Sequence, residues 1–174
     1  MPIINPRLRF IEKFLVKFNS AFSTKHQRSI FREFIYAMFP DYKRMSLWAV
    51  ANNTTVNYQK LQYFFSEANW NMKELNDIRI KILQNQRTTK ANKDGVLAID
   101  DTACPKPHAE KTEGAQVQYC GCLGKKENAN VAVASCFVSN SKHFPVDFKS
   151  YLPITTPNPK NFKSKLDLAK ELID

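Results

Sequence analysis

The sequence predicts an α+β protein in which a bundle of about five short helices precedes a region of strands that closes with a helix. Apolar residues in the first half recur at steps of three and four, which is typical of amphipathic helices. After the polar residues 87–94 and Gly95, short apolar runs and alternating patterns take over, and these are typical of strands. We therefore expect two regions, residues 1–90 and residues 95–174.

Each helix of the first region is expected where an apolar stripe lies between polar turns. Asn57 and Asn71 are predicted to cap the last two helices, because an Asn side chain accepts a hydrogen bond from an unpaired amide of the first turn. Trp48 and Trp70 are expected to anchor the core. The predicted helices lie over residues 8–22, 25–39, 43–51, 58–68 and 72–86.

Strands are expected from Val96 onwards. Residues 96–99 are predicted to form a buried strand that ends in Asp100, Asp101 and Thr102, with a loop over residues 103–116. The remaining elements are expected to be a strand over 117–123, a charged turn over 124–130, strands over 131–138 and 144–152, the latter with Phe144, Val146 and Phe148 on one face, and an amphipathic helix over 161–174.

Positive charge is concentrated in the first region. The formal net charge of the chain is +10, of which residues 1–95 carry +9 and residues 96–174 carry +1. Such an asymmetry favours a polyanionic partner, and we expect that partner to be double-stranded DNA. From composition alone, a generally basic soluble protein is the simpler alternative.

Composition also argues against several other classes. No apolar run is long enough to span a membrane and the first residues lack a signal-peptide pattern, so we expect a cytoplasmic protein without membrane contact. Its four cysteines are expected to be reduced. Cys104, His108, Cys120 and Cys122 do not have the spacing of a usual zinc site, and Cys120 and Cys122 are expected on one face of a strand.

Two adjacent acids at the end of a buried strand are the most informative feature. Carboxylates there lose hydration unless a cation lies close, and Mg²⁺ is a natural partner because it prefers carboxylate oxygen. Successive residues of a strand point to opposite faces, so Asp100 and Asp101 cannot both ligate one ion. One is expected to face the site, while the other supports it or lies on the back. A strand end whose acids are solvated, or cap the next turn, is the alternative.

Four segments in a fixed order carry a resemblance to a known family. They are a strand ending in Asp-Asp-Thr, a Pro-Lys loop, a Tyr-Cys-Gly-x-Leu-Gly-Lys segment and a Pro-x-Asp-x-x-x-Tyr-Leu-Pro segment, at residues 96–102, 105–106, 119–125 and 145–153. Residues 58–71 resemble the helical segment that precedes this domain. Over residues 40–174 the chain thus resembles the cut-and-paste insertion-sequence transposases of the DDE superfamily.

The resemblance implies an RNase H-like catalytic domain, a mixed sheet with a helix, in which two Asp and one Glu bind two Mg²⁺ (or Mn²⁺) ions. By this resemblance, the metals first activate a water molecule that hydrolyses a DNA strand at the element's end. They then activate the freed 3′-hydroxyl for strand transfer. Asp101 is implied as the first carboxylate and metal ligand, with Asp100 as the runner-up or a supporting group. The implied partners are DNA of the element ends and the target, bound by a homodimer.

The chain departs from the family pattern in one respect. The second Asp is expected at the end of the strand that follows the closing helix, and the Glu lies further on. Asp174 ends a helix and therefore does not fill the second role. We expect an incomplete RNase H-like domain, from a truncated, interrupted or split gene, that is inactive alone and prone to self-association through its exposed sheet.

Basic and amide side chains suggest where DNA is contacted. A helix-turn-helix over residues 43–67 is expected to bring Lys60, with Gln59 or Gln62, to the groove and Arg44 to a phosphate; a plain helical bundle is equally open. Four lysines that flank the acidic strand end are expected to hold phosphates near the metal, with ordinary solvated lysines as the alternative: Lys106, Lys111, Lys125 and Lys126.

Three functions follow from these patterns. The first is that of a transposase fragment, and the second is that of a non-catalytic DNA-binding protein that occupies element ends. The third is that of a metal-dependent nuclease or phosphatase whose site is assembled from two chains. Only the third predicts Mg²⁺-dependent cleavage by the isolated homo-oligomer.

Overall fold

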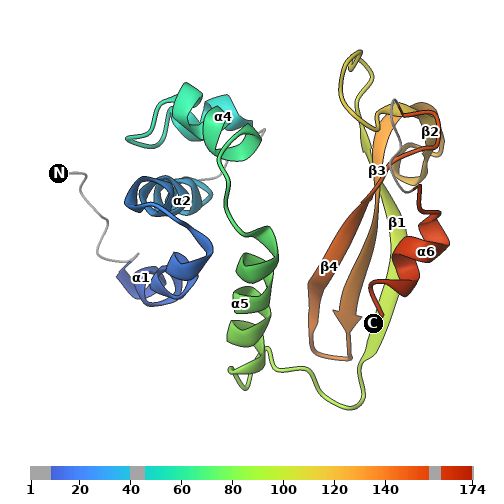
Figure 1. Ribbon diagram of the computed structural model, residues 1–174. Coiled ribbons are helices and arrows are strands. Elements are labelled where there is room, and N and C mark those ends of the chain that lie inside the picture. Colours follow the sequence, from blue (N-terminus) through green and yellow to red (C-terminus); the bar gives the residue numbers. More distant parts are fainter. Residues whose placement is uncertain (1–8, 40–45, 157–161, 174) are drawn as a thin grey trace. The chain divides into compact units, whose positions relative to one another are not determined.

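The computed structural model describes residues 9–39, 46–156 and 162–173. The chain divides into two compact units, Met1–Asn85 and Gln86–Asp174. The first unit is helical, and the second is a sheet followed by a helix (Figure 1), so the α+β class is confirmed. No helix within the described ranges is long and apolar enough to cross a membrane.

Side-chain caps start most helices of the first unit. As predicted, Asn57 accepts a hydrogen bond from the amide of Lys60 (3.0 Å) and Asn71 accepts one from the amide of Glu74 (2.9 Å). The first predicted helix is a short α-helix continued by a 3-10 helix. The helices are α1 (Arg9–Leu15), η2 (Val16–Ala21), α2 (Lys25–Ala37), α3 (Leu47–Ala51), α4 (Tyr58–Ser66) and α5 (Met72–Gln84).

Aromatic rings fill the core of this unit. Phe64 is buried, and its ring stacks on Trp70 with centroids 5.6 Å apart, while Trp70 Nε1 donates a hydrogen bond to the Phe64 carbonyl (2.9 Å). Trp48 does not share this role, since 65% of its surface is exposed. The prediction for Trp48 was wrong because α3 is only five residues long and buries Val50 alone.

The second unit is built around one long central strand. Strand β3 (Lys125–Val138) pairs antiparallel with β1 (Val96–Pro105), β2 (Gln116–Cys120) and β4 (His143–Tyr151). Because β1 and β4 pair with the same part of β3, they lie on its opposite edges, whereas β2 pairs only with its beginning. A 3-10 turn, η3 (Gly121–Leu123), joins β2 to β3, and α6 (Lys165–Lys170) follows the sheet.

Several sequence predictions for the strands of this unit were wrong. β1 continues to Pro105 instead of ending at Thr102, because its pairing with β3 extends that far. Residues 125–129 are strand and not turn, because they pair with β2. A register shift between Ser135 and Cys136 separates the aromatic side chains of β4, so Phe144 is buried while Phe148 is exposed.

One face of the sheet is covered and the other is open. Alternate residues of β3, among them Val131, Val133 and Ser135, are buried, whereas those between them are only half-buried. Helix α6 contacts β1, β3 and β4. It is shorter than predicted: of the expected apolar stripe, Leu168 is buried but Leu166 is exposed.

Candidate catalytic face of the sheet

The two adjacent acids lie in the middle of β1. Asp100 is paired across the sheet with Ala134 and Asp101 with Val133, so their side chains take opposite faces, as the alternation of a strand predicts. Both acids are exposed, and so are Val96 and Leu97 at the start of the strand. The predicted buried strand is therefore an exposed one, and it is paired only with β3 among the described strands.

Asp101 faces the covered side of the sheet. Its neighbour Val133 is buried, and its carboxylate forms an ion pair with the Nζ of Lys165, the first residue of α6. The two side chains keep 46% and 40% of their surface exposed. The same Nζ lies 5.4 Å from the ring centroid of Tyr151 on β4, within the range of a cation–π contact. A positive charge is thus fixed against the Asp101 carboxylate.

Asp100 has a different environment on the open side. Its Oδ1 accepts a hydrogen bond from the backbone amide of Asp101 (2.8 Å). This bond orients the Asp100 side chain along its own strand. It does not bring the two carboxylates to one ligand position, since they leave opposite faces of β1.

The described residues do not form a metal site by themselves. No group of three or more His, Cys, Asp or Glu side chains within the described ranges is placed to hold an ion. Asp101 therefore offers one carboxylate, whereas a pair of metal ions needs several oxygen ligands.

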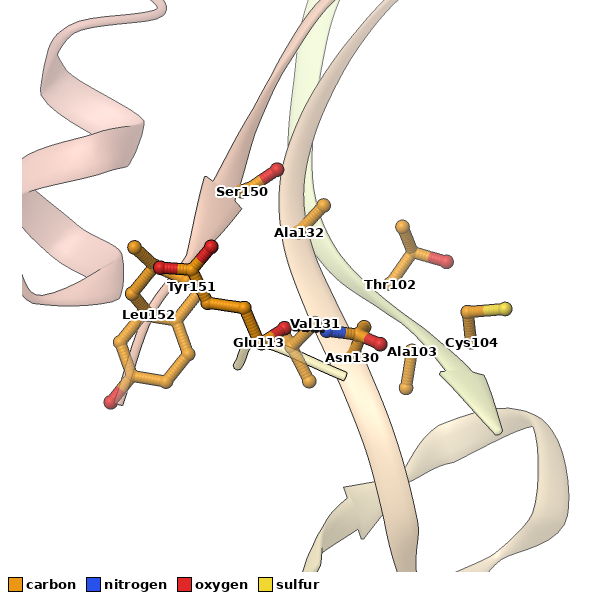
Figure 2. Close-up of a pocket in the computed structure, with 10 residues that line it drawn as sticks. All are labelled: Thr102, Ala103, Cys104, Glu113, Asn130, Val131, Ala132, Ser150, Tyr151 and Leu152. Carbon is orange, nitrogen blue, oxygen red and sulfur yellow. Dashed lines mark hydrogen bonds between the residues drawn. The ribbon is translucent and has the colours of Figure 1, made fainter. Parts of the chain in front are cut away.

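A hollow of the second unit lies along β1, β3 and β4 and is lined from both faces of these strands. It has a volume of about 410 Å³, and its wall includes Thr102, Ala132 and Ser150, which form one cross-strand row on the Asp100 side of the sheet. Figure 2 shows these side chains together with Glu113, whose carbonyl accepts a hydrogen bond from Asn130 Nδ2 (2.8 Å). The hollow does not include Asp101.

The lysines predicted near the acids are spread along the sheet. Lys125 and Lys126 begin β3, seven or eight residues before Val133, which corresponds to about 23–26 Å of strand at 3.3 Å per residue. Lys106 follows β1, and its backbone amide donates a hydrogen bond to the carbonyl of Asn128 (2.7 Å). The structure therefore does not bring these lysines next to Asp101; Lys111 lies in the loop between β1 and β2.

One of these lysines has a defined partner. Lys125 Nζ lies 3.1 Å from a carboxylate oxygen of Glu127. Two hydrogen bonds hold the pKa of Glu127 below its usual value. The one from Lys125 has the larger effect, and the one from the Asn128 amide has the smaller. Glu127 therefore stays ionised and neutralises part of the positive charge of Lys125.

The predicted groove residues of the first unit lie on α4. Gln59, Lys60 and Gln62 are exposed, whereas Leu61 and Phe64 are buried beneath the helix. A six-residue segment, 52–57, separates α3 from α4. Arg44 lies outside the described residues.

Sequence analysis missed Lys165. It is 64 positions from Asp101, and nothing in the local pattern links the two. The expected amphipathic helix over residues 161–174 is only a weak signal for this contact. It predicts that the helix packs on the sheet, but it does not predict which of its residues meets Asp101.

Comparison with known proteins identifies the family. Residues 17–170 match the family model described as DDE superfamily endonuclease. A protein of Microchaete diplosiphon named as a probable transposase for insertion sequence element IS701 is 27% identical over 149 residues. That match covers 85% of this chain but only 38% of the relative's length. No solved structure matches the chain. Since the family model matches most of its length, the chain belongs to the DDE superfamily endonuclease family.

Proposed function

We propose that this chain contributes the first catalytic carboxylate, Asp101, and a DNA-binding region to a DNA transposase. The observation that carries the proposal is the position of Asp101 in a strand of a family-matched sheet, on the covered face and against a fixed cation. The relative named as an IS701 transposase supports the reaction class, and the order of strands around β3, followed by α6, is compatible with an RNase H-like fold. Asp100 is then a supporting group on the back of the strand.

Enzymes of this superfamily use divalent metal ions, and we propose Mg²⁺ or Mn²⁺ here. Asp101 would be one ligand among several, together with carboxylates that the described residues do not supply. The chain's own contribution is to hold Asp101 in place. The buried Val133 lies beside it on β3 and packs the sheet, and Lys165 compensates the negative charge while no other cation is present.

The first unit is the proposed DNA-binding region. Most of the chain's net charge of +10 belongs to residues 1–95. The outward face of α4 carries Gln59 and Gln62, whose amides match the hydrogen-bonding edge of adenine, and Lys60 stands beside them to meet a phosphate. We propose that this helix lies in the major groove, that Arg44, Lys106, Lys125 and Lys126 contact backbone phosphates, and that the DNA-bound form is a homodimer.

Fluorescence anisotropy with a labelled duplex tests this assignment. We expect binding that weakens steeply with salt, and a Lys60→Ala chain whose slope of log K against log salt is smaller by about one. Lys73→Ala is the matched control, because Lys73 is an exposed lysine of the same unit that is already paired with Asp77. Salt-independent binding, or equal slopes for the two variants, contradicts the proposal.

A non-catalytic DNA-binding protein is the second candidate. It is favoured because no group of three or more possible ligand side chains within the described residues is placed to hold a metal ion. We expect the isolated chain to bind DNA but not to cut it, with either Mg²⁺ or Mn²⁺. Metal-dependent cleavage that is lost in Asp101→Asn would instead favour a site completed by a second copy of the chain.

A further inference from the structure

Two thiols meet at the corner between β2 and β3. The Sγ atoms of Cys120 and Cys122 are 3.5 Å apart. On a straight strand, side chains two residues apart would stand about 6.6 Å from each other. The 3-10 turn η3, which contains Cys122, instead folds this side chain back against Cys120. The prediction that both cysteines lie in one strand was therefore wrong. Cys120 ends β2 and Cys122 lies in η3, and this turn brings their thiols together.

The two thiols differ in access. Cys120 is completely buried, whereas Cys122 is exposed. Burial, and then the hydrogen bond with Cys122, raise the pKa of the Cys120 thiol. Cys120 therefore stays protonated at neutral pH, and Cys122 is the sulfur of the pair that a dissolved reagent reaches first.

We propose that Cys120 and Cys122 form an oxidation site, at which a peroxide converts the two thiols into a disulfide. In the first step the Cys122 sulfur attacks the peroxide: an S–O bond forms, the O–O bond breaks, and a sulfenic acid and water result. In the second step the Cys120 sulfur attacks the sulfenic sulfur, the S–S bond forms, and a second water leaves with the Cys120 proton. Two electrons pass from the thiols to the peroxide.

The corner has room for this closure. A disulfide bond is about 2.05 Å long, so the sulfurs must approach by about 1.5 Å. Gly121 lies between the cysteines, and no atom lies within 4 Å of where a Cβ would stand on it. The turn can therefore shift without a clash at this position. Of the other two cysteines, Cys136 donates a hydrogen bond from Sγ to the Phe144 carbonyl (3.2 Å). Cys104 is exposed on β1 and follows Ala103, whose carbonyl accepts a hydrogen bond from Cys122 Sγ (3.8 Å).

Alkylation after oxidation tests the site. The whole chain is treated with hydrogen peroxide, quenched, unfolded and alkylated with an excess of a maleimide. We expect the wild-type chain to lose two of its four alkylatable thiols. Before alkylation, the mass of the oxidised chain should be lower by two hydrogen atoms. Peptide mapping should place the disulfide between Cys120 and Cys122, and dithiothreitol should restore both thiols.

Two serine variants make the test specific. Cys122→Ser changes an exposed residue and should keep all of its remaining thiols alkylatable, whereas Cys104→Ser, the matched control, should still lose two. Phenylarsine oxide, which needs two neighbouring thiols, should bind the wild-type chain and not Cys122→Ser. Four intact thiols in the oxidised wild-type chain, or a disulfide between Cys104 and Cys122, would overturn the proposal.

Discussion

Replacing Lys165 with Met tests whether the cation beside Asp101 stabilises the second unit. Methionine keeps an unbranched side chain against Tyr151 but removes the charge. The ion pair is partly exposed, 46% for Asp101 and 40% for Lys165, so its contribution should lie near the upper end of the range for surface pairs, about 1 kcal/mol. In a unit of this size that corresponds to a fall in melting temperature of about 4–8 °C.

A double-mutant cycle measures this interaction directly. Wild type, Asp101→Asn, Lys165→Met and the double variant are unfolded with urea and followed by circular dichroism. Tryptophan fluorescence is unsuitable, because Trp48 and Trp70 both belong to the first unit. We expect a coupling energy of about 0.5–1 kcal/mol that shrinks as salt screens the exposed pair.

A neighbouring ion pair provides the control for this cycle. Lys163 pairs with Glu171 beside the same helix and has a comparable exposure. Lys163→Met should therefore show no coupling with Asp101→Asn, although it also removes a charge from this segment. If both lysine variants couple equally to Asp101→Asn, or neither does, the assignment of Lys165 as the cation of Asp101 is refuted.

Three further predictions concern the stability of the two units. Phe64→Ala should destabilise the first unit by about 3–5 kcal/mol, because a buried ring stacked on Trp70 is lost, and tryptophan fluorescence during urea unfolding measures it. Gly124→Ala should cost about 1 kcal/mol, because Gly124 has φ +63°, whereas Gly121→Ala, in open space and without a positive φ, should cost less in the same circular-dichroism assay. Hydrogen bonds from Ser164 lower the pKa of Asp167. The ionised Asp167 therefore stabilises the second unit at neutral pH, and this stabilisation is lost as the pH falls through the lowered pKa. Asp167→Asn should remove this part of the acid dependence of the melting temperature.

Local chemistry explains which elements the sequence could predict. Helix starts were found because an Asn at the cap and an apolar stripe behind it act within one turn, as at Asn57 and Asn71. The change of period after Gly95 likewise marks the passage from helices to strands. The alternation of a strand was enough to predict that Asp100 and Asp101 take opposite faces.

Features that depend on distant partners were missed. The polar residues 125–129 look like a turn, yet they form a strand because β2 offers them a partner. The bulge in β4 at Val146 sends Phe144 and Phe148 to different environments, although their spacing suggests one face. Trp48 was assigned to the core by residue type alone, but the short α3 leaves it exposed.

The choice between the two acids shows how sequence and structure combine. Family resemblance pointed to Asp101, and strand alternation allowed only one acid on each face. The structure adds that the Asp101 face is the one on which Val133 is buried and Lys165 supplies a charge, whereas the Asp100 face is open. A carboxylate that is held on a packed face, yet is 46% exposed because β1 pairs only with β3 among the described strands, is both fixed and reachable. A carboxylate needs both properties if it is to bind a metal ion together with side chains from other parts of the protein. This favours Asp101 over Asp100 as the metal ligand.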